Sequence, residues 1–325
     1  MKQRIVLMPP NWLGDVVLAQ PALRALCQHY QDADIEVFGR SWLPDLIPFL
    51  NLNHPSIRYA PEITKHSDAV FLFPNSLRSA LQAFASRGKK RVGFRKEGRG
   101  MLLTHAFTST VDLIHEHHRG YYLDMLKQFG LPTPYSNVEL VVPEEEMKSA
   151  QALLVAQNIN VERFICVAPG AQFGGAKRYP AESYAAVLKR ISADGWDIVV
   201  LGTPAEREIA SQCVSQVSGH FWNASGQTSL RQALQIVGAT KLMLCNDSGL
   251  MHVAAGMGVP TVTMFGATDP NRTSPSGIKT HVLYKPATCS PCLQRECNVL
   301  GHPCMANIMP EHVYDACKAF LDNIE

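Results

Sequence analysis

The sequence predicts an α/β protein built from two parallel-sheet domains, and two observations carry this prediction. First, apolar runs typical of buried strands alternate with segments of helical periodicity along the chain. Second, two of these runs are each followed by a polar, glycine-containing loop and then a helix: residues 10–15 follow Ile5–Met8, and residues 246–249 follow Lys241–Cys245. Such loops form the ligand crevice of an open parallel sheet. Two of them favour a two-domain enzyme with a cleft.

Length and composition agree with this architecture. The chain has 325 residues, 46% hydrophobic and 18% charged, which suits two folded domains and argues against a disordered or fibrous chain. Residues 1–4 lead into an apolar run too short for a signal sequence or a membrane span. We therefore expect a cytoplasmic protein. For its nine cysteines we expect reduced thiols or metal ligands rather than disulfides.

In the first half of the chain, strand-like and helix-like segments alternate, which predicts βαβ units and a parallel sheet. The strand-like exit at Leu140–Pro143 precedes three glutamates that favour a helix start, and this marks the domain boundary. The expected elements are strands at Ile5–Met8, Ile35–Phe38 and Ala69–Phe73, and helices at Val16–His29 and Ser76–Ala85.

The second half repeats the alternation. Gly195 closes one of its helices, and Pro310 suits the first turn of the last helix. The expected strands are Phe164–Ala168, Trp196–Leu201, Lys241–Cys245 and Thr261–Phe265, and the expected helices are Ala181–Asp194, Leu230–Gly238, Gly249–Gly258 and Pro310–Ile324.

Asp15 ends the first glycine-containing loop. That loop has a single glycine, so it lacks the G-x-G-x-x-G pattern of a dinucleotide-binding fold. A carboxylate held where a strand ends and a helix begins points into the crevice, where it can take a proton from a hydroxyl. The alternative is that Asp15 only caps the helix.

Two loops of the second half suit an anion. The loop 169–180 has glycines that permit close backbone approach, and Lys177 and Arg178 can meet phosphate oxygens; the alternative is an exposed connector. Residues 246–252 place N–H groups at a helix start, with Ser248 and His252 nearly one turn apart, which suits an anionic leaving group. A lone histidine near an apolar helical face is more often a packed core residue than a ligand, so His252 alone carries little weight. The small-residue loop at 265–270 belongs to the same expected sheet edge.

The run from Arg87 to Arg99 holds seven basic residues and one acid. Such a run predicts contact with an anionic surface, substrate or nucleic acid. Its single aromatic residue, Phe94, gives no stacking platform, which counts against specific binding of single-stranded nucleic acid. The alternative is a solvated face.

Cys289, Cys292, Cys297 and Cys304 form a C-x2-C-x4-C-x6-C pattern beside His302. Four thiols so close in the chain can make a tetrahedral zinc site of structural type. The spacing is not that of a standard zinc finger, and redox-active or free thiols are the alternatives.

Four segments taken together resemble the ADP-heptose:lipopolysaccharide heptosyltransferase family, and most of all its heptosyltransferase II members. They occur in order over nearly the whole chain, although the cysteine cluster departs from the pattern expected of the family. The segments are Pro-Asn-Trp-Leu-Gly-Asp at 10–15, Pro-Asn-Ser-Leu-Arg-Ser-Ala at 74–80, Pro-Gly-Ala-Gln-Phe-Gly-Gly-Ala-Lys-Arg-Tyr-Pro at 169–180, and Asn-Asp-Ser-Gly-Leu-Met-His-Val-Ala-Ala at 246–255.

The resemblance implies the GT-B fold, in which two Rossmann-like parallel-sheet domains face a central cleft. It implies an acceptor-binding domain at 1–155, an ADP-sugar-binding domain at 156–309, and a final helix at 310–325 that crosses back to the first domain. The implied enzyme is an inverting glycosyltransferase that moves heptose from ADP-L-glycero-D-manno-heptose to a heptose of the lipopolysaccharide inner core. Asp15 would be its general base.

The resemblance also implies the binding residues and partners. Lys177 would compensate the diphosphate charge as a catalytic residue, so that no cofactor is needed for catalysis. The donor-binding candidates are Gly170, Lys177, Glu206, Thr228, Asp247, Ser248, Gly249 and His252, and the acceptor-binding candidates are Asn11, Trp12, Asn75, Arg78, Lys90, Arg91 and Arg95.

The expected partners are ADP-heptose, a lipid A–Kdo–heptose acceptor and, transiently, the cytoplasmic membrane surface at the inner face of the inner membrane, with no nucleic acid. Two alternatives stay open. One is another GT-B sugar-nucleotide enzyme, such as a different glycosyltransferase or a UDP-sugar epimerase. The other is a non-catalytic module that binds an anionic polymer.

Overall fold

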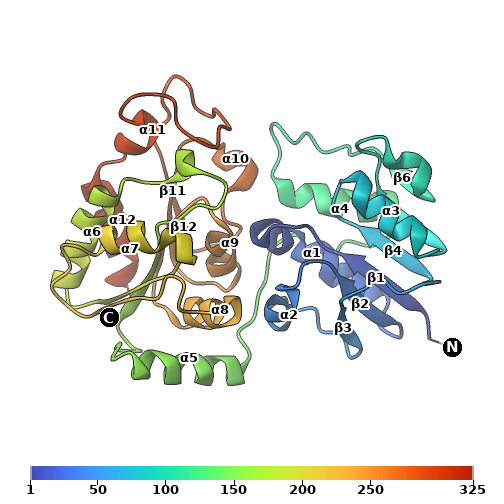
Figure 1. Ribbon diagram of the computed structural model, residues 1–325, viewed down its shortest axis with the longest axis horizontal. Helices are drawn as coiled ribbons and strands as arrows, with labels where there is room; N and C mark the ends of the chain where they lie inside the picture. The colour runs from blue at the N-terminus through green and yellow to red at the C-terminus, as the bar shows by residue number, and fades with distance from the viewer. Residues whose placement is uncertain (1, 324–325) are drawn as a thin grey trace. The chain divides into compact units, whose positions relative to one another are not determined.

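The computed structural model describes residues 2–323, and the chain forms two compact units, Met1–Val141 and Val142–Glu325. Each unit contains one six-stranded sheet with helices on it (Figure 1). Ile324, where we expected the last helix to end, lies outside the described residues. Within residues 2–323, no helix is both long enough and apolar enough to cross a membrane.

The first unit contains a fully parallel sheet with the strand order β3-β2-β1-β4-β5-β6. Three of its strands, β3, β5 and β6, were not predicted, and β5 lies inside the basic run. The strands are β1 (Arg4–Met8), β2 (Asp34–Phe38), β3 (Ile57–Ala60), β4 (Ala69–Leu72), β5 (Lys90–Phe94) and β6 (His105–Phe107).

Helices cover both faces of this sheet. Helix α1 packs against α4, and Phe71 of β4 contacts Phe129 at the end of α4. The neighbouring residues Val70 and Leu72 point to the opposite face, where they pack against α3. The helices are α1 (Leu13–His29), α2 (Leu43–Leu46), α3 (Leu77–Ala85) and α4 (His118–Gln128), with 3₁₀ turns η1 (Ile47–Phe49) and η2 (Arg99–Leu102).

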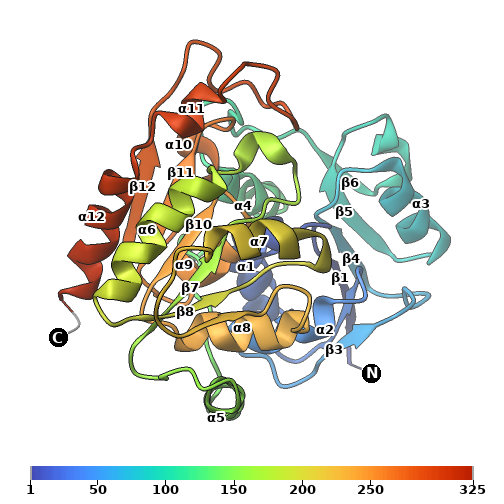
Figure 2. The same ribbon diagram turned by 60° about the vertical axis from the view of Figure 1, so that its left-hand side comes forward.

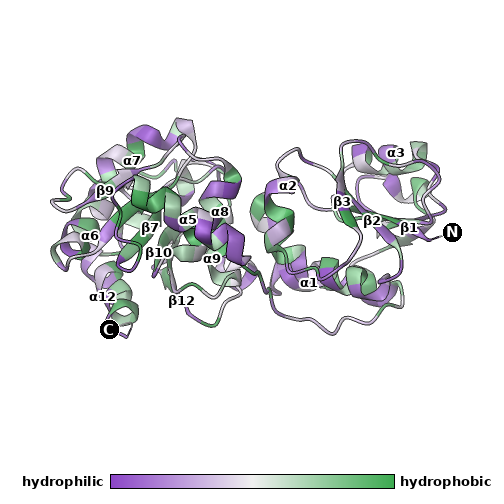
Figure 3. Ribbon diagram, turned by 90° about the horizontal axis from the view of Figure 1, so that it is seen from below, coloured by the Kyte–Doolittle hydropathy of each residue, from purple (hydrophilic) through white to green (hydrophobic). Residues whose placement is uncertain are grey.

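The second unit contains a parallel sheet with the strand order β12-β11-β10-β7-β8-β9. Figure 3 shows its central strands β7 and β10 as hydrophobic, as expected for strands buried on both faces. The strands are β7 (Phe164–Ala168), β8 (Asp197–Val200), β9 (Phe221–Asn223), β10 (Met243–Asn246), β11 (Thr261–Phe265) and β12 (Thr280–Tyr284).

Alternate residues of β7 face different helices. Ile165 and Val167 join the core beneath α6, α7 and α12, whereas the Cys166 thiol contacts the Ile236 carbonyl of α8; Figure 2 shows these layers. The helices are α5 (Glu144–Ala156), α6 (Ala181–Ala193), α7 (Arg207–Cys213), α8 (Leu230–Ala239), α9 (Gly249–Gly256), α10 (Pro270–Thr273), α11 (Pro303–Ala306) and α12 (Pro310–Leu321), with 3₁₀ turns η3 (Gly175–Lys177) and η4 (Pro204–Glu206).

The terminal helices of the second unit pack within that unit. Helix α5 contacts α8, and α12 contacts α6 and β11. We expected α5 to belong to the first domain, which was to end at residue 155, but the compact units divide at Val141 and Val142. The expected return of the last helix to the first domain stays a prediction.

Both sheets have the doubly wound strand order. All strands run parallel, but the chain adds them outward in one direction on one side of a switch point between two central strands and in the other direction on the other side. The switch point lies between β1 and β4 in the first sheet and between β7 and β10 in the second. Ligands bind beyond the carboxyl ends of the strands at such a switch point. The segments at 10–15, 74–80, 169–180 and 246–255 begin at the carboxyl ends of these four strands. The topology therefore places each pair of segments at one sheet edge, and the predicted α/β class of two Rossmann-like sheets is confirmed.

Candidate functional site

The loop between β1 and α1 places Asp15 in the first turn of α1. The helix begins at Leu13, and its N-cap is Trp12, whose side chain makes no capping hydrogen bond. Asp15 is therefore not the N-cap residue, the position in which an aspartate most often caps a helix. The pKa of Tyr122 in α4 is raised well above its usual value, first by burial and then by the charge of Asp15. The Asp15 carboxylate thus lies near a buried phenol, while Asn11 and Trp12 are exposed.

Arg99 is fully buried and fixes the loop between β4 and α3. A buried guanidinium is tolerated when its donors find acceptors, and burial lowers the pKa of Arg99. The Tyr121 hydroxyl donates to the Asn75 side-chain oxygen at 3.0 Å. Arg99 itself donates to that oxygen, to the carbonyls of Phe94, Pro74 and Ser76, and to the Ser79 hydroxyl. The basic run is therefore not one continuous surface, because its last cation supports the loop between β4 and α3 from inside.

Replacing Arg99 by Met should lower the free energy of unfolding of the first unit by about 3 kcal/mol or more, because several buried acceptors lose their donor at about 1–3 kcal/mol each. Urea titration followed by circular dichroism measures the change. Lys96→Met removes an exposed cation four residues after the buried Val92 and serves as the control that should leave the midpoint unchanged. A loss below about 1 kcal/mol for Arg99→Met would contradict the role of Arg99.

Lys90 and Arg91 begin β5, so they lie at the amino end of that strand. In a parallel sheet this is the edge opposite to the motif loops. The Arg91 guanidinium is also engaged locally, because it donates to the carbonyls of Leu102 and Gly88, both at 2.7 Å. The structure does not bring these two acceptor candidates together with Asp15.

Arg95 and Arg78 lie at the carboxyl edge of the first sheet, the edge opposite to the one that carries Lys90 and Arg91. Arg95 follows the carboxyl end of β5 and donates to the Ala106 carbonyl, and Arg78 is exposed in the first turn of α3. Both therefore belong to the sheet edge that carries Asn75 and Asp15. Of the basic acceptor candidates, these two are placed to contact a ligand of that edge.

In the second unit, Lys177 lies against a buried carboxylate beside the start of α9. Its ammonium is 2.6 Å from Asp247 Oδ2, and the Thr268 hydroxyl donates to the same oxygen at 2.6 Å. The Lys177 side chain is only 14% exposed and that of Asp247 only 5%. Each buried charge is therefore stabilised by the opposite charge of its partner. Because an ammonium carries three donors, Lys177 can bind an anion while it keeps Asp247.

Asn246 joins the two motif segments of the second sheet. Its side chain is fully buried at the end of β10. Its amide nitrogen donates to the carbonyls of Pro169 and Gly170, at 2.7 and 3.3 Å. Its amide oxygen accepts from the Tyr179 backbone N–H and the Tyr184 hydroxyl, both at 3.1 Å. Three of these four hydrogen bonds hold the loop 169–180 against β10, and the fourth joins β10 to α6.

Ser248, Gly249 and His252 lie in the first turn of α9. Ser248 is the N-cap, yet its side chain makes no capping hydrogen bond, and its hydroxyl is buried without a hydrogen-bond partner in the described part of the chain. His252 is buried within the helix. A buried polar atom without a partner at a helix N-terminus marks a place where a ligand can accept or donate a hydrogen bond.

Glu206 and Gly170 lie in direct contact. A Cβ atom at position 170 would lie 1.9 Å from Glu206 Oε1, so a glycine there gives the carboxylate room to approach the loop. Glu206 Oε2 accepts hydrogen bonds from the backbone N–H and the hydroxyl of Thr203, both at 2.8 Å. Thr228 is half-buried and directly precedes Ser229, the N-cap of α8.

Residues 285–304, here called the cysteine segment, cover the turn that carries Lys177. The Ala176 N–H donates to the Arg295 carbonyl at 2.9 Å, and the Gly175 N–H donates to Glu296 at 3.0 Å. A Cβ atom at Gly174 would lie 2.1 Å from the Arg295 carbonyl oxygen, so this backbone approach requires glycine. The cysteine segment therefore positions Lys177, which gives this unusual region a structural role.

The four thiols of the cysteine segment are free in the structure. Burial raises the pKa of Cys304, and the neighbouring charges of Cys297, Cys289 and Cys292 raise it further against the lowering effect of a Ser290 hydrogen bond. Within residues 2–323, no group of three or more His, Cys, Asp or Glu side chains is arranged to hold a metal ion. The structural zinc stays a prediction.

Elemental analysis tests the zinc site. If the prediction holds, protein purified without added metal contains stoichiometric zinc, and Cys292→Ser loses it, because a tetrahedral thiolate site needs all four ligands. Asn298→Ser is the matched control, since Asn298 is exposed in the same segment and carries no thiol. Absence of metal from the unaltered protein would remove the site.

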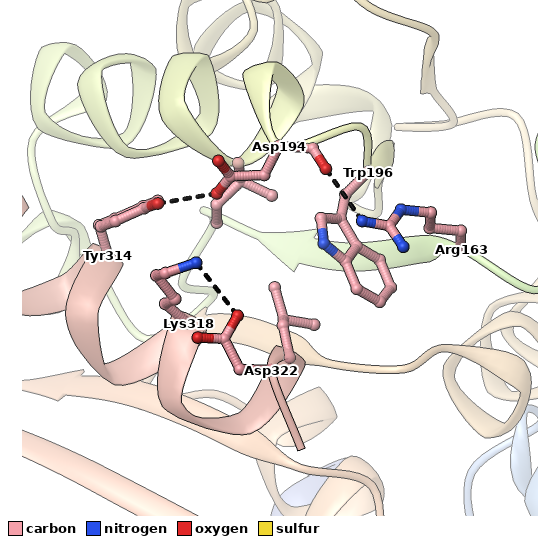
Figure 4. A pocket seen from close by; sticks show the side chains of 8 residues that line it. Arg163, Asp194, Trp196, Tyr314, Lys318 and Asp322 are labelled. Atoms are coloured by element: carbon pink, nitrogen blue, oxygen red, sulfur yellow. Dashed lines mark hydrogen bonds and ion pairs between the residues drawn. The ribbon is translucent and has the colours of Figure 1, made fainter. Parts of the chain in front are cut away.

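A cavity of about 200 Å³ lies in the second unit, away from the motif loops. Arg163 and Trp196 line it and precede β7 and β8, so it lies at the amino edge of the sheet. Its charged groups contact protein partners, and we assign no ligand to it. Figure 4 shows these contacts: Tyr314 with Asp194, Lys318 with Asp322, and Arg163 with the Asp194 backbone.

The model of glycosyltransferase family 9 (heptosyltransferase) matches residues 62–302. The chain belongs to glycosyltransferase family 9. The resemblance drawn from the four segments is therefore confirmed, and this family 9 protein is a glycosyltransferase. Membership favours an enzyme over the non-catalytic polymer-binding module.

Known relatives cover nearly the whole family 9 chain. It is 30% identical over 309 residues to lipopolysaccharide heptosyltransferase 2 of Salmonella typhimurium, covering 86% of this chain and 87% of the relative. It is 28% identical over 345 residues to lipopolysaccharide heptosyltransferase 2 of Escherichia coli, covering 98% of each. The solved structure of E. coli ADP-heptose lps heptosyltransferase II superposes with a TM-score of 0.80, at 27% identity and 99% coverage of both chains. The expected GT-B fold class is confirmed.

Sequence reasoning about this family 9 protein missed several residues that organise the site. Asn246 and Thr268 lay inside flagged loops, and their polar character was the available signal. Arg99, Tyr121 and Tyr122 gave no such signal, because α4 was not predicted and a basic residue at the end of a charged run resembles a surface residue.

Proposed function

We propose that this protein transfers heptose from ADP-L-glycero-D-manno-heptose to a heptose of the lipopolysaccharide inner core. The names of its relatives support the sugar and the acceptor class. The observation that carries the donor half is the group at the start of α9, where Lys177 meets Asp247 and the Ser248 hydroxyl is buried without a partner among residues 2–323. A cation and helix N–H groups at one point suit a diphosphate.

In the proposed reaction, Asp15 removes the proton of an acceptor heptose hydroxyl. The oxygen attacks the anomeric carbon of the donor from the face opposite ADP, and the bond between that carbon and the phosphate oxygen breaks, which inverts the configuration. Lys177 and the backbone N–H groups around Ser248 and Gly249 compensate the charge that leaves with ADP. In this proposal the protein groups alone supply the compensation, and no cofactor takes part in catalysis.

We further propose that the first unit binds the acceptor and the second unit binds the donor. Asn11, Trp12, Asn75, Arg78 and Arg95 share the sheet edge of Asp15 and are the acceptor contacts that the geometry supports. Glu206, held against Gly170, suits the hydroxyls of the donor ribose, and Thr228 the adenine side of the same site. The enzyme would work in the cytoplasm at the inner face of the inner membrane.

A transfer assay tests this function. The protein is incubated with ADP-heptose and a heptose-containing, Kdo-linked lipid A acceptor, and the product is identified by mass spectrometry. UDP- and GDP-sugars are the matched alternative donors, because a different GT-B enzyme or an epimerase would use one of those. Transfer from ADP-heptose alone is the expected result. Binding of ADP-heptose without transfer would show that the acceptor is wrong, and absence of ADP-sugar binding would refute the proposed donor.

A further inference from the structure

Helix α3 turns its large apolar side chains away from the protein. Ser79, Ala80 and Ala83 form its buried face, and small residues there let the helix lie close to the sheet. The outer face carries Leu77, Leu81 and Phe84, which are 43%, 50% and 51% exposed. A surface helix ordinarily shows the reverse, with large apolar residues inward and polar residues outward.

The exposed side chains form a continuous stripe. Leu77, Leu81 and Phe84 are four and three residues apart, so they lie on one side of the helix. The exposed Met101 belongs to η2, the turn that packs against α3. We call these four residues the α3 apolar patch. Apolar side chains gathered in this way on a surface mark an interaction site rather than ordinary exposure.

Cations surround the α3 apolar patch. The Arg91 guanidinium lies 5.3 Å from the centre of the Phe84 ring. Arg78 is exposed on the helix itself, and Arg87 is exposed just beyond its end. Two acids of this region are engaged with protein partners: Asp68 binds Lys89 at 2.8 Å, and Glu97 accepts from the Leu77 N–H at 3.3 Å. An apolar stripe bordered by basic residues is the pattern of helices that lie in a membrane interface.

We propose that the α3 apolar patch docks this protein onto an anionic phospholipid surface. The inference rests on the proposed function, because a lipid A acceptor is presented by a membrane. Negative headgroups complement the surrounding cations. A second copy of the chain does not complement them, since a symmetric dimer through this patch would bring the same cations face to face.

The position of the patch fits a role in acceptor delivery. Leu77 follows Asn75 and Ser76, the loop that Arg99 and Tyr121 hold at the carboxyl edge of the first sheet. With α3 lying in the headgroup layer, this edge is brought within reach of sugars carried on a lipid anchor. The docking surface and the proposed acceptor edge are thus adjacent along the chain.

Vesicle co-sedimentation of the full-length protein tests the proposal. The vesicles contain phosphatidylcholine alone or a three-to-one mixture with phosphatidylglycerol. The unaltered protein should bind the mixed vesicles, and Leu81→Ser/Phe84→Ser should weaken that binding by about tenfold or more. Val155→Ser is the matched control, because Val155 is an apolar residue of α5 that is 62% exposed, and it should not change binding. Arg78→Gln/Arg87→Gln should weaken binding to the mixed vesicles alone.

Two further measurements distinguish membrane docking from a loss of catalytic activity and from dimer formation. Transfer to a de-acylated, water-soluble acceptor should be unchanged in Leu81→Ser/Phe84→Ser, whereas transfer to an acceptor embedded in vesicles should fall with the binding. Vesicle binding that survives this double substitution would overturn the proposal. A dimer in sedimentation that the substitution dissociates would assign the patch to a second copy and overturn it as well. Normal vesicle binding without any heptose transfer would refute the proposed function and leave the docking surface standing.

Discussion

Asp15→Asn should lower the rate of heptose transfer by about 100- to 10,000-fold, the usual contribution of a positioned general base. The amide cannot accept the proton of the attacking hydroxyl at neutral pH, but it keeps nearly the same shape. ADP should bind the variant as it binds the unaltered protein, because Asp15 belongs to the first unit and Lys177, Asp247 and Ser248 to the second. Single-turnover kinetics with labelled donor and calorimetry with ADP measure the two effects.

The chain offers a matched control for this substitution. Asp45 is also an aspartate in the first turn of a helix of the first unit, and Asp45→Asn should leave transfer intact. Loss of a carboxylate at such a position lowers stability by up to about 1 kcal/mol through the helix dipole. If Asp15→Asn showed only a stability change of that size and normal turnover, Asp15 would have a structural role and would leave the mechanism.

Lys177→Met should weaken ADP binding by about 10- to 100-fold, the value of a lost charge-assisted hydrogen bond, and should lower turnover by about 100- to 1,000-fold. The reason is that Lys177 supplies the positive charge at the start of α9. Lys189→Met provides the control, because Lys189 is exposed on α6 and should have no effect. Calorimetry with ADP and steady-state kinetics with ADP-heptose measure the two effects.

A second variant separates the phosphate role of Lys177 from its role in folding. Lys177→Met alone leaves Asp247 as a buried charge without its cation, a loss of about 3–5 kcal/mol. Lys177→Met/Asp247→Asn removes both charges and should regain most of the thermal stability, while ADP binding stays weak. Recovery of ADP affinity together with stability would show that Lys177 only maintains the fold.

The parts of the site that the sequence predicted are those whose signal is local. The loops 10–15, 169–180 and 246–255 were visible because an apolar strand, a turn-forming glycine or proline and a helix follow one another within a few residues. The strand order then brings the loops 169–180 and 246–255 to one edge of the second sheet and the loop 10–15 to the same kind of edge in the first sheet, as the rule for parallel sheets requires. Asp15, Lys177 and Asp247 could accordingly be named as candidates from the sequence, and their roles stay predictions.

The parts that the sequence could not predict depend on partners far along the chain. Arg99 and Lys90 look alike in the basic run, but only Arg99 has acceptors at Pro74 and Asn75 to satisfy it in the interior. Lys90 begins β5, whose β-forming residues lie between basic residues in the sequence. For this reason no strand was predicted there. The outward face of α3 also escaped prediction, because an amphipathic pattern does not say which side of a helix meets the sheet.

The Asn246 amide has a consequence for the kinetics of donor binding. Three of its hydrogen bonds fasten the loop 169–180 to the end of β10 through protein atoms alone. The loop therefore loses little conformational freedom when a nucleotide arrives, and a preformed site binds without a preceding isomerisation. ADP association should accordingly follow a single exponential whose rate rises linearly with concentration, so that donor exchange is governed by the lifetime of the complex.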